Sequence, residues 1–171
     1  MANNILEYKG YKIGKSIKES NCKKTIEEIF SLAKINNCNI FYPTDVSVGK
    51  NFNDKSKIKN LSEIENDDLI LDIGDETIKT IVHLIKKSKT ILWNGPAGYF
   101  ENSNFAKGSI QIAQTIVNTE NKIYSVVGGG DTIAVLNKAN ILKQFNFVST
   151  AGGAFLEYLE GKELPGIKVL N

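Results

Sequence analysis

Three consecutive glycines, Gly128–Gly130, lie between an apolar β-type run and a helix-like segment that begins with an acidic residue and a threonine. Glycine has no side chain with which to build a core, but it lets the backbone turn sharply and lets a ligand approach the main chain. The N–H groups at the start of the following helix would point at that ligand, and the helix dipole favours an anion there. The stretch Ser125–Thr132 therefore predicts a phosphate site.

The same succession of an apolar strand, a short turn and a helix recurs along the second half of the chain. Apolar periodicity predicts strands at 68–73, 90–93, 122–127 and 145–148, and helices at about 75–87, 105–118 and 132–137, with one more ending near 161. Such an alternation favours a parallel sheet with helices on both faces. We therefore expect an α/β fold with a Rossmann-like three-layer αβα arrangement.

The N-terminal part of the chain does not follow this alternation. Its pattern predicts the tail of a helix at 1–8, a helix at 25–35, a short strand at 39–42, and a long polar connection at 44–68 with short strands near 45–48 and 56–58. A start inside a helix, with no strand before it, is unusual for an α/β protein.

Three glycine-rich turns are expected at one edge of the sheet: Asn94–Gly98, Gly128–Asp131 and Ala151–Gly153. In a parallel α/β sheet the strand-to-helix turns share the edge at which ligands bind. Three such turns together indicate a phosphorylated ligand such as a nucleotide. A second candidate, Gly14-Lys15-Ser16, fails as a P-loop because the motif needs glycine where the chain has Lys9, and no strand precedes it.

Four side chains near these turns could bind a nucleotide. A carboxylate beside phosphates requires a cation, so Asp131 could hold Mg²⁺, although a plain helix N-cap explains it equally well. Thr132 could donate to a phosphate or simply sit in the first helical turn. Glu101 could accept hydrogen bonds from ribose hydroxyls, or it could be a solvated loop charge. Asn94 could face the ligand or stabilise its turn.

Composition excludes several other classes of protein. The 171 residues are 42% hydrophobic and 23% charged, which suits a soluble globular domain with its own core. No run of 18 apolar residues predicts a membrane span, and Met1–Asn4 does not begin a signal peptide. The net charge is only +2 and the lysines are spread along the chain, so we expect no nucleic-acid partner.

Side chains for nucleophilic or metal catalysis are scarce. His83 is the only histidine, and Cys22 and Cys38 form neither a CxxC motif nor a metal-ligand spacing, which predicts idle thiols in a reducing compartment. A Ser–His–Asp or Cys–His set is therefore not expected. All 21 basic residues are lysine. The chain thus cannot supply a bidentate guanidinium clamp for a phosphate or carboxylate.

Taken together, these segments resemble the C-terminal, nucleotide-binding domain of phosphoglycerate kinase. The resemblance is carried by Thr90–Glu101 (TILWNGPAGYFE), Val127–Thr132 (VGGGDT) and Val148–Lys162 (VSTAGGAFLEYLEGK), and Leu69–Gly74, Met1–Asn3 and Ile13–Ser16 also fit. It covers essentially the whole chain, residues 1–171.

The resemblance implies Mg²⁺-dependent phosphoryl transfer between 1,3-bisphosphoglycerate and ADP, giving 3-phosphoglycerate and ATP, in a cytoplasmic glycolytic enzyme. It implies nucleotide contacts for Asn94 and for Glu101, the latter at the ribose. It assigns Gly129, Gly130, Asp131 and Thr132 to the phosphate-binding turn, with Asp131 near the metal. It also assigns Gly152 and Gly153 to a helix N-terminus that steadies the transferring phosphoryl group. The family has a third glycine where this chain has Ala151, which is harmless only if that residue has an ordinary φ.

The family enzyme has two domains and more than twice this length, so the resemblance implies a partial nucleotide-binding domain without the phosphoglycerate-binding domain. The phosphoglycerate would then bind only if the missing domain is supplied. Three alternatives follow: an N-terminally truncated and inactive fragment, one half of a split enzyme, or a non-enzymatic nucleotide-binding module.

Overall fold

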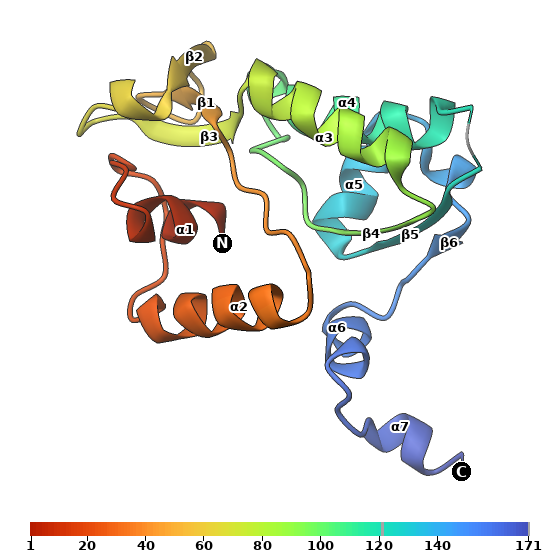
Figure 1. Ribbon diagram of the computed structural model, residues 1–171. Coiled ribbons are helices and arrows are strands. Elements are labelled where there is room, and N and C mark those ends of the chain that lie inside the picture. Colours follow the sequence, from red (N-terminus) through yellow and green to blue (C-terminus); the bar gives the residue numbers. More distant parts are fainter. Residues whose placement is uncertain (121, 171) are drawn as a thin grey trace. The chain divides into compact units, whose positions relative to one another are not determined.

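A computed structural model describes residues 1–120 and 122–170, which form two compact units. Unit 1 comprises Met1–Ile81 and Ala97–Gly108, and unit 2 comprises Val82–Pro96 and Ser109–Asn171. Each unit is described separately below, with the element labels of Figure 1.

Unit 1 is built around a three-stranded antiparallel sheet with the strand order β2-β1-β3. Its elements are α1 (Ala2–Tyr8), α2 (Lys23–Ile35), β1 (Asp45–Gly49), β2 (Lys57–Asn60), the short 3-10 helix η1 (Leu61–Glu63), β3 (Leu69–Ile73) and the 3-10 helix η2 (Ser103–Phe105). All five residues of the central strand β1 are buried, whereas the edge strand β2 buries only Lys59. Val46 and Val48 are the apolar residues of β1, whereas the buried Asp45 and Ser47 are polar.

The core of unit 1 joins the N-terminal helix to this sheet. Leu6 of α1 is fully buried with Val46 and Val48 of β1, and the cluster is completed by Ile13, Leu61 and Ile64. The predicted helices at 1–8 and 25–35 are confirmed, as are the short strands near 45–48 and 56–58.

Two expectations for this part of the chain are wrong. Residues 39–42 form no strand; Phe41 is exposed, and Tyr42 is partly buried against the core. The strand β3 pairs antiparallel with β1 and is not the first strand of the parallel sheet. Apolar periodicity reports that a segment is extended and buried, but it does not report which neighbour the strand pairs with.

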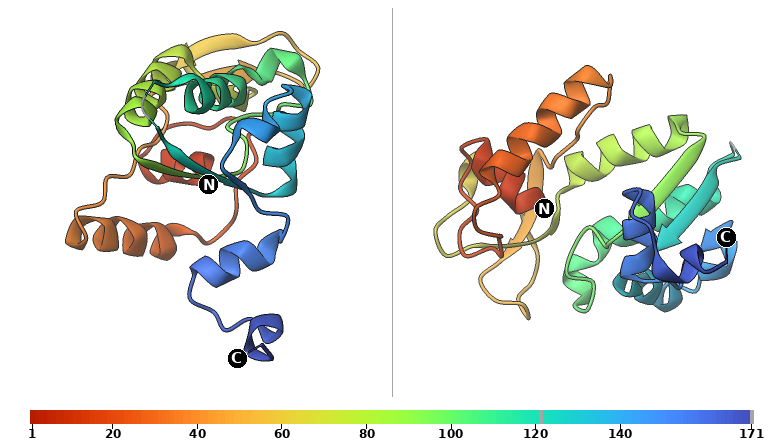
Figure 2. Two further views of the ribbon diagram at one scale, coloured as in Figure 1. Left: turned by 90° about the vertical axis from the view of Figure 1, so that its right-hand side faces the viewer. Right: turned by 90° about the horizontal axis from the view of Figure 1, so that it is seen from below.

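Unit 2 contains the parallel sheet, formed by β4 (Thr90–Asn94), β5 (Tyr124–Gly128) and β6 (Phe147–Val148) in that order. Two helices, α3 (Asp75–Lys87) and α4 (Lys107–Asn118), have residues in both units. The other elements of unit 2 are α5 (Gly130–Lys138), the 3-10 helix η3 (Leu142–Gln144), α6 (Gly153–Leu159) and α7 (Pro165–Lys168). Figures 1 and 2 show α4 and α5 on one side of β4 and β5, with α6 on the other. The predicted α/β class, with helices flanking a parallel sheet, is confirmed.

The register of the parallel strands divides the sheet into two faces. Trp93, Val127 and Val148 pair in one row, and the first two are buried. Leu92, Val126 and Phe147 pair in the neighbouring row, which lies on the opposite face because side chains alternate along a strand.

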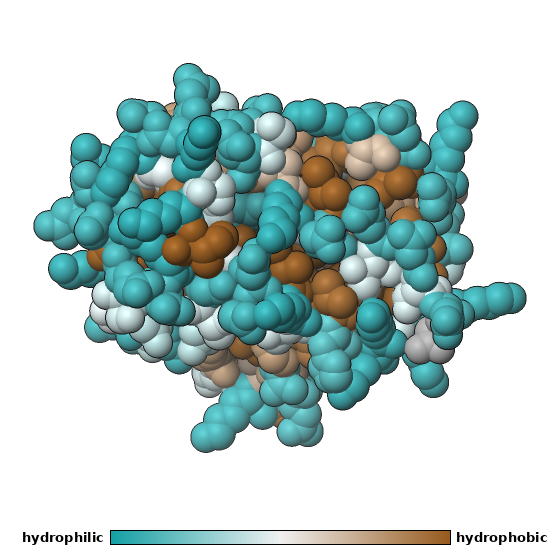
Figure 3. Space-filling view, turned by 90° about the horizontal axis from the view of Figure 1, so that it is seen from above, coloured by the Kyte–Doolittle hydropathy of each residue, from teal (hydrophilic) through white to brown (hydrophobic). Residues whose placement is uncertain are grey.

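No helix within the described residues is long and apolar enough to cross a membrane. On the face of the molecule seen in Figure 3, hydrophilic residues cover most of the surface and hydrophobic ones show between them. The single histidine, His83, is exposed, and both cysteines are free thiols.

Candidate functional site

The carboxyl ends of β4 and β5 bring Asn94 and the triglycine turn together. Asn94 pairs in register with Gly128. A Cβ atom placed on Gly128 would lie 3.2 Å from the Asn94 Nδ2 atom, and one on Gly129 would lie 3.2 Å from Asn94 Oδ1. The Asn94 amide therefore lies against the main chain of both glycines, and a larger residue at either position would displace it.

The helix after the triglycine turn begins without a side-chain cap. Gly129 is the N-cap of α5 and has φ +87°, a left-handed conformation that favours glycine. Asp131 is the second residue of the helix and is exposed, so the plain N-cap explanation for this carboxylate is wrong. No N-cap side chain therefore accepts a hydrogen bond from the first N–H groups of α5.

Thr132 holds the two glycine-rich turns together. It is fully buried, and its hydroxyl accepts a hydrogen bond of 2.7 Å from the Gly95 N–H. On the other side, the Trp93 indole N–H donates to the Gly95 carbonyl at 2.7 Å. The Thr132 hydroxyl, which we predicted to bind a phosphate, thus accepts a hydrogen bond from the neighbouring turn.

Replacing Thr132 by valine keeps the side-chain shape but leaves the Gly95 N–H without its acceptor. We expect Thr132→Val to lower the free energy of unfolding by about 1 kcal/mol, the lower end of the cost of an unsatisfied donor, because Gly95 is only partly buried. Urea denaturation measures the change. Thr115→Val is the matched control, since the Thr115 hydroxyl donates to the Gln111 carbonyl of its own helix. Equal losses in the two variants would contradict this role for Thr132.

The third glycine-rich turn reaches the same edge through α6. A Cβ atom on Gly128 would lie 2.8 Å from Phe155 Cδ1 of α6, so the aromatic ring packs directly on the triglycine turn. Within the third turn the left-handed residue is Gly152, with φ +58°, and Ala151 has no positive φ. The alanine at position 151 is therefore compatible with the turn. Gly152 and Gly153 lie at the start of α6.

Glu101 belongs to unit 1, whereas the other predicted site residues belong to unit 2. The Glu101 side chain is exposed, in a loop held by the Asn102 side-chain amide, which donates to the Phe52 carbonyl at 2.7 Å. The Tyr99 N–H also donates to the Leu71 carbonyl at 2.6 Å. The ribose role of Glu101 remains a prediction.

Asp72, the fourth residue of β3, is a positioning residue that was not predicted from the sequence. Its carboxylate is 2% exposed and accepts the N–H groups of Gly108 and Ile73, both at 2.8 Å. Gly98 and Gly108 pack so closely on this carboxylate that neither could carry a Cβ atom. Asp72 thereby fixes both ends of the segment that carries Glu101. The sequence does contain a signal for this role: a charged residue inside the apolar run 69–73 needs hydrogen-bond partners when the run is buried.

Burial raises the pKa of the Asp72 carboxyl to about 6, and the two N–H donors and the charge of Lys107 only partly oppose the shift. Lys107 itself forms an ion pair with Asp75 at 2.7 Å. The carboxyl of Asp72 therefore titrates close to neutral pH, and its effect on stability is taken up in the Discussion.

The segment Gly14–Ser16, which fails as a P-loop, has a structural role in unit 1. The Lys15 N–H donates to the Asp68 carbonyl at 2.7 Å, and the Ser16 hydroxyl accepts the Ile70 N–H at 2.8 Å. These contacts attach residues 14–16 to the start of β3. The Lys15 N–H and the Ser16 hydroxyl are therefore both engaged in contacts within unit 1.

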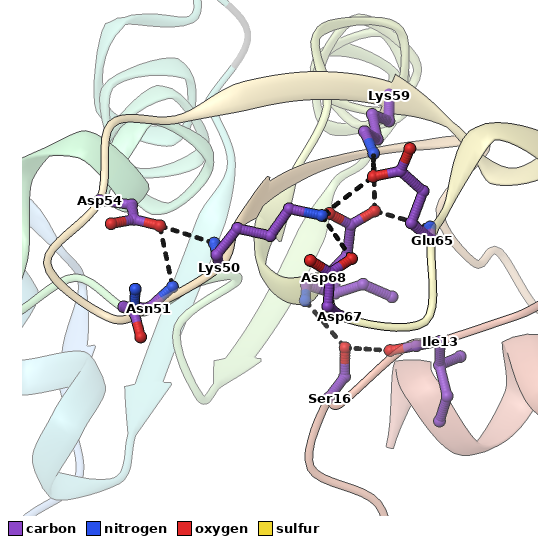
Figure 4. A network of polar contacts seen from close by, with 10 residues as sticks. Ile13, Ser16, Lys50, Asn51, Asp54, Lys59, Glu65, Asp67 and Asp68 are labelled. Atoms are coloured by element: carbon purple, nitrogen blue, oxygen red, sulfur yellow. Dashed lines mark hydrogen bonds and ion pairs between the residues drawn. The ribbon is translucent and has the colours of Figure 1, made fainter.

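Figure 4 shows a network of ion pairs beside this segment. The Lys50 ammonium lies 2.9 Å from Glu65, 2.6 Å from Asp67 and 2.9 Å from Asp68, and the buried Lys59 lies 2.7 Å from Asp68. The three carboxylates are close enough together to hold a cation. Because the ammonium groups of Lys50 and Lys59 already pair with these carboxylates, the cluster is a structural network.

Comparison with known proteins bears on the whole chain. The family model described as phosphoglycerate kinase matches residues 1–162. Phosphoglycerate kinase of Zymomonas mobilis is 44% identical over 100% of this chain, and so is that of Francisella tularensis subsp. novicida; the chain covers 44% of each.

Solved structures give the same relationship. Phosphoglycerate kinase from Coxiella burnetii superposes with a TM-score of 0.92 at 41% identity, covering 99% of this chain and 44% of that one. The enzyme from Pyrococcus horikoshii superposes with a TM-score of 0.76 at 28% identity, covering 99% and 42%. The chain therefore spans less than half the length of the relatives it matches. It belongs to the phosphoglycerate kinase family.

Proposed function

We propose that the glycine-rich edge of unit 2 binds ADP or ATP with Mg²⁺, and that this chain supplies the nucleotide side of a phosphoglycerate kinase. The observation that carries the proposal is the convergence of Asn94, the triglycine turn and the start of α5 at one edge of the parallel sheet. The uncapped N–H groups of α5 would receive the nucleotide phosphates, because the helix dipole favours an anion there.

The residues at this edge fit a magnesium ion that is held mainly by the nucleotide. Mg²⁺ takes one or two protein carboxylates together with phosphate oxygens and waters. Asp131 is an exposed carboxylate in the first turn of α5, and no cluster of three metal-ligating side chains within the described residues includes it. Bound there, the ion would neutralise charge on the phosphate oxygens.

The remaining assignments follow the family resemblance. Glu101 would accept hydrogen bonds from the ribose hydroxyls. The N–H groups of Gly152 and Gly153 would steady the phosphoryl group during transfer. The second substrate, 1,3-bisphosphoglycerate or 3-phosphoglycerate, carries negative charge, and this arginine-free chain has no guanidinium group for a bidentate clamp, so its site would lie in the remainder of the family chain. The proposed setting is cytoplasmic glycolysis.

Asp131 offers the sharpest test of nucleotide binding. Isothermal titration calorimetry should show Mg·ADP binding to the folded chain, and Asp131→Asn should weaken it about tenfold, equivalent to about 1.4 kcal/mol. When EDTA removes the metal, the variant should bind ADP at least as tightly as the unaltered chain, because the Asp131 carboxylate would then repel the phosphates. Glu28→Gln, at an exposed carboxylate of α2, is the matched control and should bind normally. Absence of heat at millimolar nucleotide, with the chain shown to be folded, would rule the proposal out.

We also expect the 171-residue chain alone to turn over slowly or not at all. Phosphoryl transfer depends on positioning both substrates and on positive charge over the moving group. A coupled assay for ATP formation from 1,3-bisphosphoglycerate and ADP measures the rate. Turnover near that of a full-length relative measured beside it would refute the need for the remainder of the family chain.

A further inference from the structure

The segment that carries Glu101 is attached to strand β3 at both of its ends through one side chain. At the far end, the Gly108 N–H donates to the Asp72 carboxylate at 2.8 Å. At the near end, a Cβ atom on Gly98 would lie 2.5 Å from the Asp72 carboxyl carbon, so the main chain of this glycine rests on the carboxyl group. Glu101 is exposed between these two contacts, and all four residues belong to unit 1. The position of Glu101 thus depends on the Asp72 carboxyl group.

The negative charge of Asp72 strengthens these contacts. Its carboxylate is 2% exposed and accepts the N–H groups of Ile73 and Gly108, both at 2.8 Å. Hydrogen bonds to an ionised acceptor are about twice as strong as those between neutral groups. A proton added to this carboxyl would therefore weaken both hydrogen bonds, because the acceptor loses its charge.

The charged groups around Asp72 do not offset the effect of its burial. Its register partner on β1 is the uncharged Ser47. At the start of α4, Lys107 favours the ionised carboxyl, but this ammonium pairs with Asp75 at 2.7 Å. The buried Asp45 of β1 accepts N–H groups from the first turn of α3. Burial therefore prevails and raises the pKa of the Asp72 carboxyl to about 6.

We propose that Asp72 is a positioning residue for the nucleotide: its ionised carboxylate holds the segment 98–108 so that Glu101 can receive the ribose, and protonation of Asp72 loosens the segment and weakens nucleotide binding. The inference rests on the proposed function, since it takes Glu101 as the ribose acceptor. It predicts two opposite trends with pH. Protonation stabilises the folded chain because a buried charge disappears, yet the same protonation lowers the affinity for nucleotide. A residue that only supported the fold would not produce opposite trends.

Calorimetric titration of Mg·ADP into the unaltered chain and into Asp72→Asn, at about pH 5 and about pH 7, tests this. About a tenth of the carboxyl is ionised at about one pH unit below its pKa of about 6, so the unaltered chain should bind up to about tenfold more weakly at the lower pH. The uncharged amide of the variant resembles the protonated carboxyl. Asp72→Asn should therefore weaken binding about tenfold at pH 7, and by a factor approaching one at pH 5.

The ratio of the two dissociation constants is the readout, because the phosphates of the nucleotide titrate alike in both experiments. Glu63→Gln is the matched control, at an exposed carboxylate of unit 1 that accepts the Asn60 N–H at 2.8 Å. It should leave the affinity unchanged at both pH values. A ratio for Asp72→Asn that is the same at both pH values would overturn the inference and leave the proposed nucleotide site intact. Absence of binding to the unaltered chain at both would overturn the proposed function and the inference with it.

A double variant tests whether Asp72 acts through Glu101. In a Glu101→Gln background, Asp72→Asn should weaken Mg·ADP binding at pH 7 less than twofold further, because the segment then has no ribose carboxylate to position. A full tenfold loss in that background would contradict the proposed route.

NMR of the chain without nucleotide gives a readout that does not depend on binding. The amide resonances of Gly98 and Gly108 should shift together with a midpoint near pH 6, and these shifts should be absent in Asp72→Asn. Amides at positions 98 and 108 that do not respond to pH in this range would overturn the inference even if the chain binds nucleotide.

Discussion

Lys59→Met should lower the free energy of unfolding by about 2 kcal/mol, the usual value of a hydrogen bond to a charged group, because it removes one of the two ammonium groups that pair with the buried Asp68 carboxylate. Lys59 and Asp68 are both buried, and their charged groups lie 2.7 Å apart. The methionine fills a similar volume but leaves the Asp68 carboxylate with the half-exposed Lys50 and the Glu65 N–H, which donates at 2.7 Å. Chemical denaturation at neutral pH measures the loss.

The matched control is Lys57→Met, which removes the same charge from an exposed position of the same strand. It should change stability by less than about 0.5 kcal/mol, as surface substitutions usually do. Equal losses from Lys57→Met and Lys59→Met would show that net charge, and not the buried pair, controls stability.

The same network sets the response to acid. Burial by itself would raise the pKa of Asp68, but hydrogen bonds from Lys59, the Glu65 N–H and Lys50 outweigh it and hold the pKa at about 2. A depressed pKa contributes stability above the ordinary value of 3.8, and that stability is lost as the pH falls toward 2. Lys59→Met should therefore unfold at a higher pH than the unaltered chain.

The Asp72 carboxyl should have the opposite effect on stability at higher pH. With its pKa raised to about 6 from 3.8, the folded chain binds this proton more tightly than the unfolded chain. The resulting stability is fully present below pH 3.8 and is lost as the pH rises through 6. The shift corresponds to as much as about 3 kcal/mol between pH 4 and pH 7.

Asp72→Asn removes the titrating group and keeps one oxygen as a hydrogen-bond acceptor. We expect the free energy of unfolding of this variant to depend much less on pH between 4 and 7, whatever its absolute value. Glu28→Gln should retain the slope of the unaltered chain. A slope that Asp72→Asn leaves unchanged would show that the Asp72 carboxyl does not titrate in this range.

The strands of the parallel sheet could be predicted from the sequence more accurately than the pairing in the antiparallel sheet. Strand β4 follows the predicted range within one residue, because a continuous apolar run between a lysine-rich helix end and a glycine turn has few other conformations. The antiparallel pairing of β3 with β1 was not foreseen, since it depends on the path of residues 50–68 and not on the strands themselves.

Part of the candidate site could likewise be predicted from the sequence, and part could not. The triglycine turn and Asn94 could be predicted to share an edge, because parallel strands end together. The partners of Thr132 and Asp72 could not, because Gly95 and Gly108 lie 37 and 36 residues away along the chain from them. Polar groups whose partners are distant in sequence leave little local pattern.

The central claim, that the glycine-rich edge of unit 2 binds a nucleotide, is tested most directly by NMR. Backbone amide shifts of the isotope-labelled chain are recorded as Mg·ADP is added. We predict that the largest changes occur at Asn94, Gly95 and Gly128–Thr132, with little change at Lys15 and Ser16. Shifts centred on residues 14–16, or no shifts at millimolar nucleotide in a folded chain, would contradict the assignment of the site.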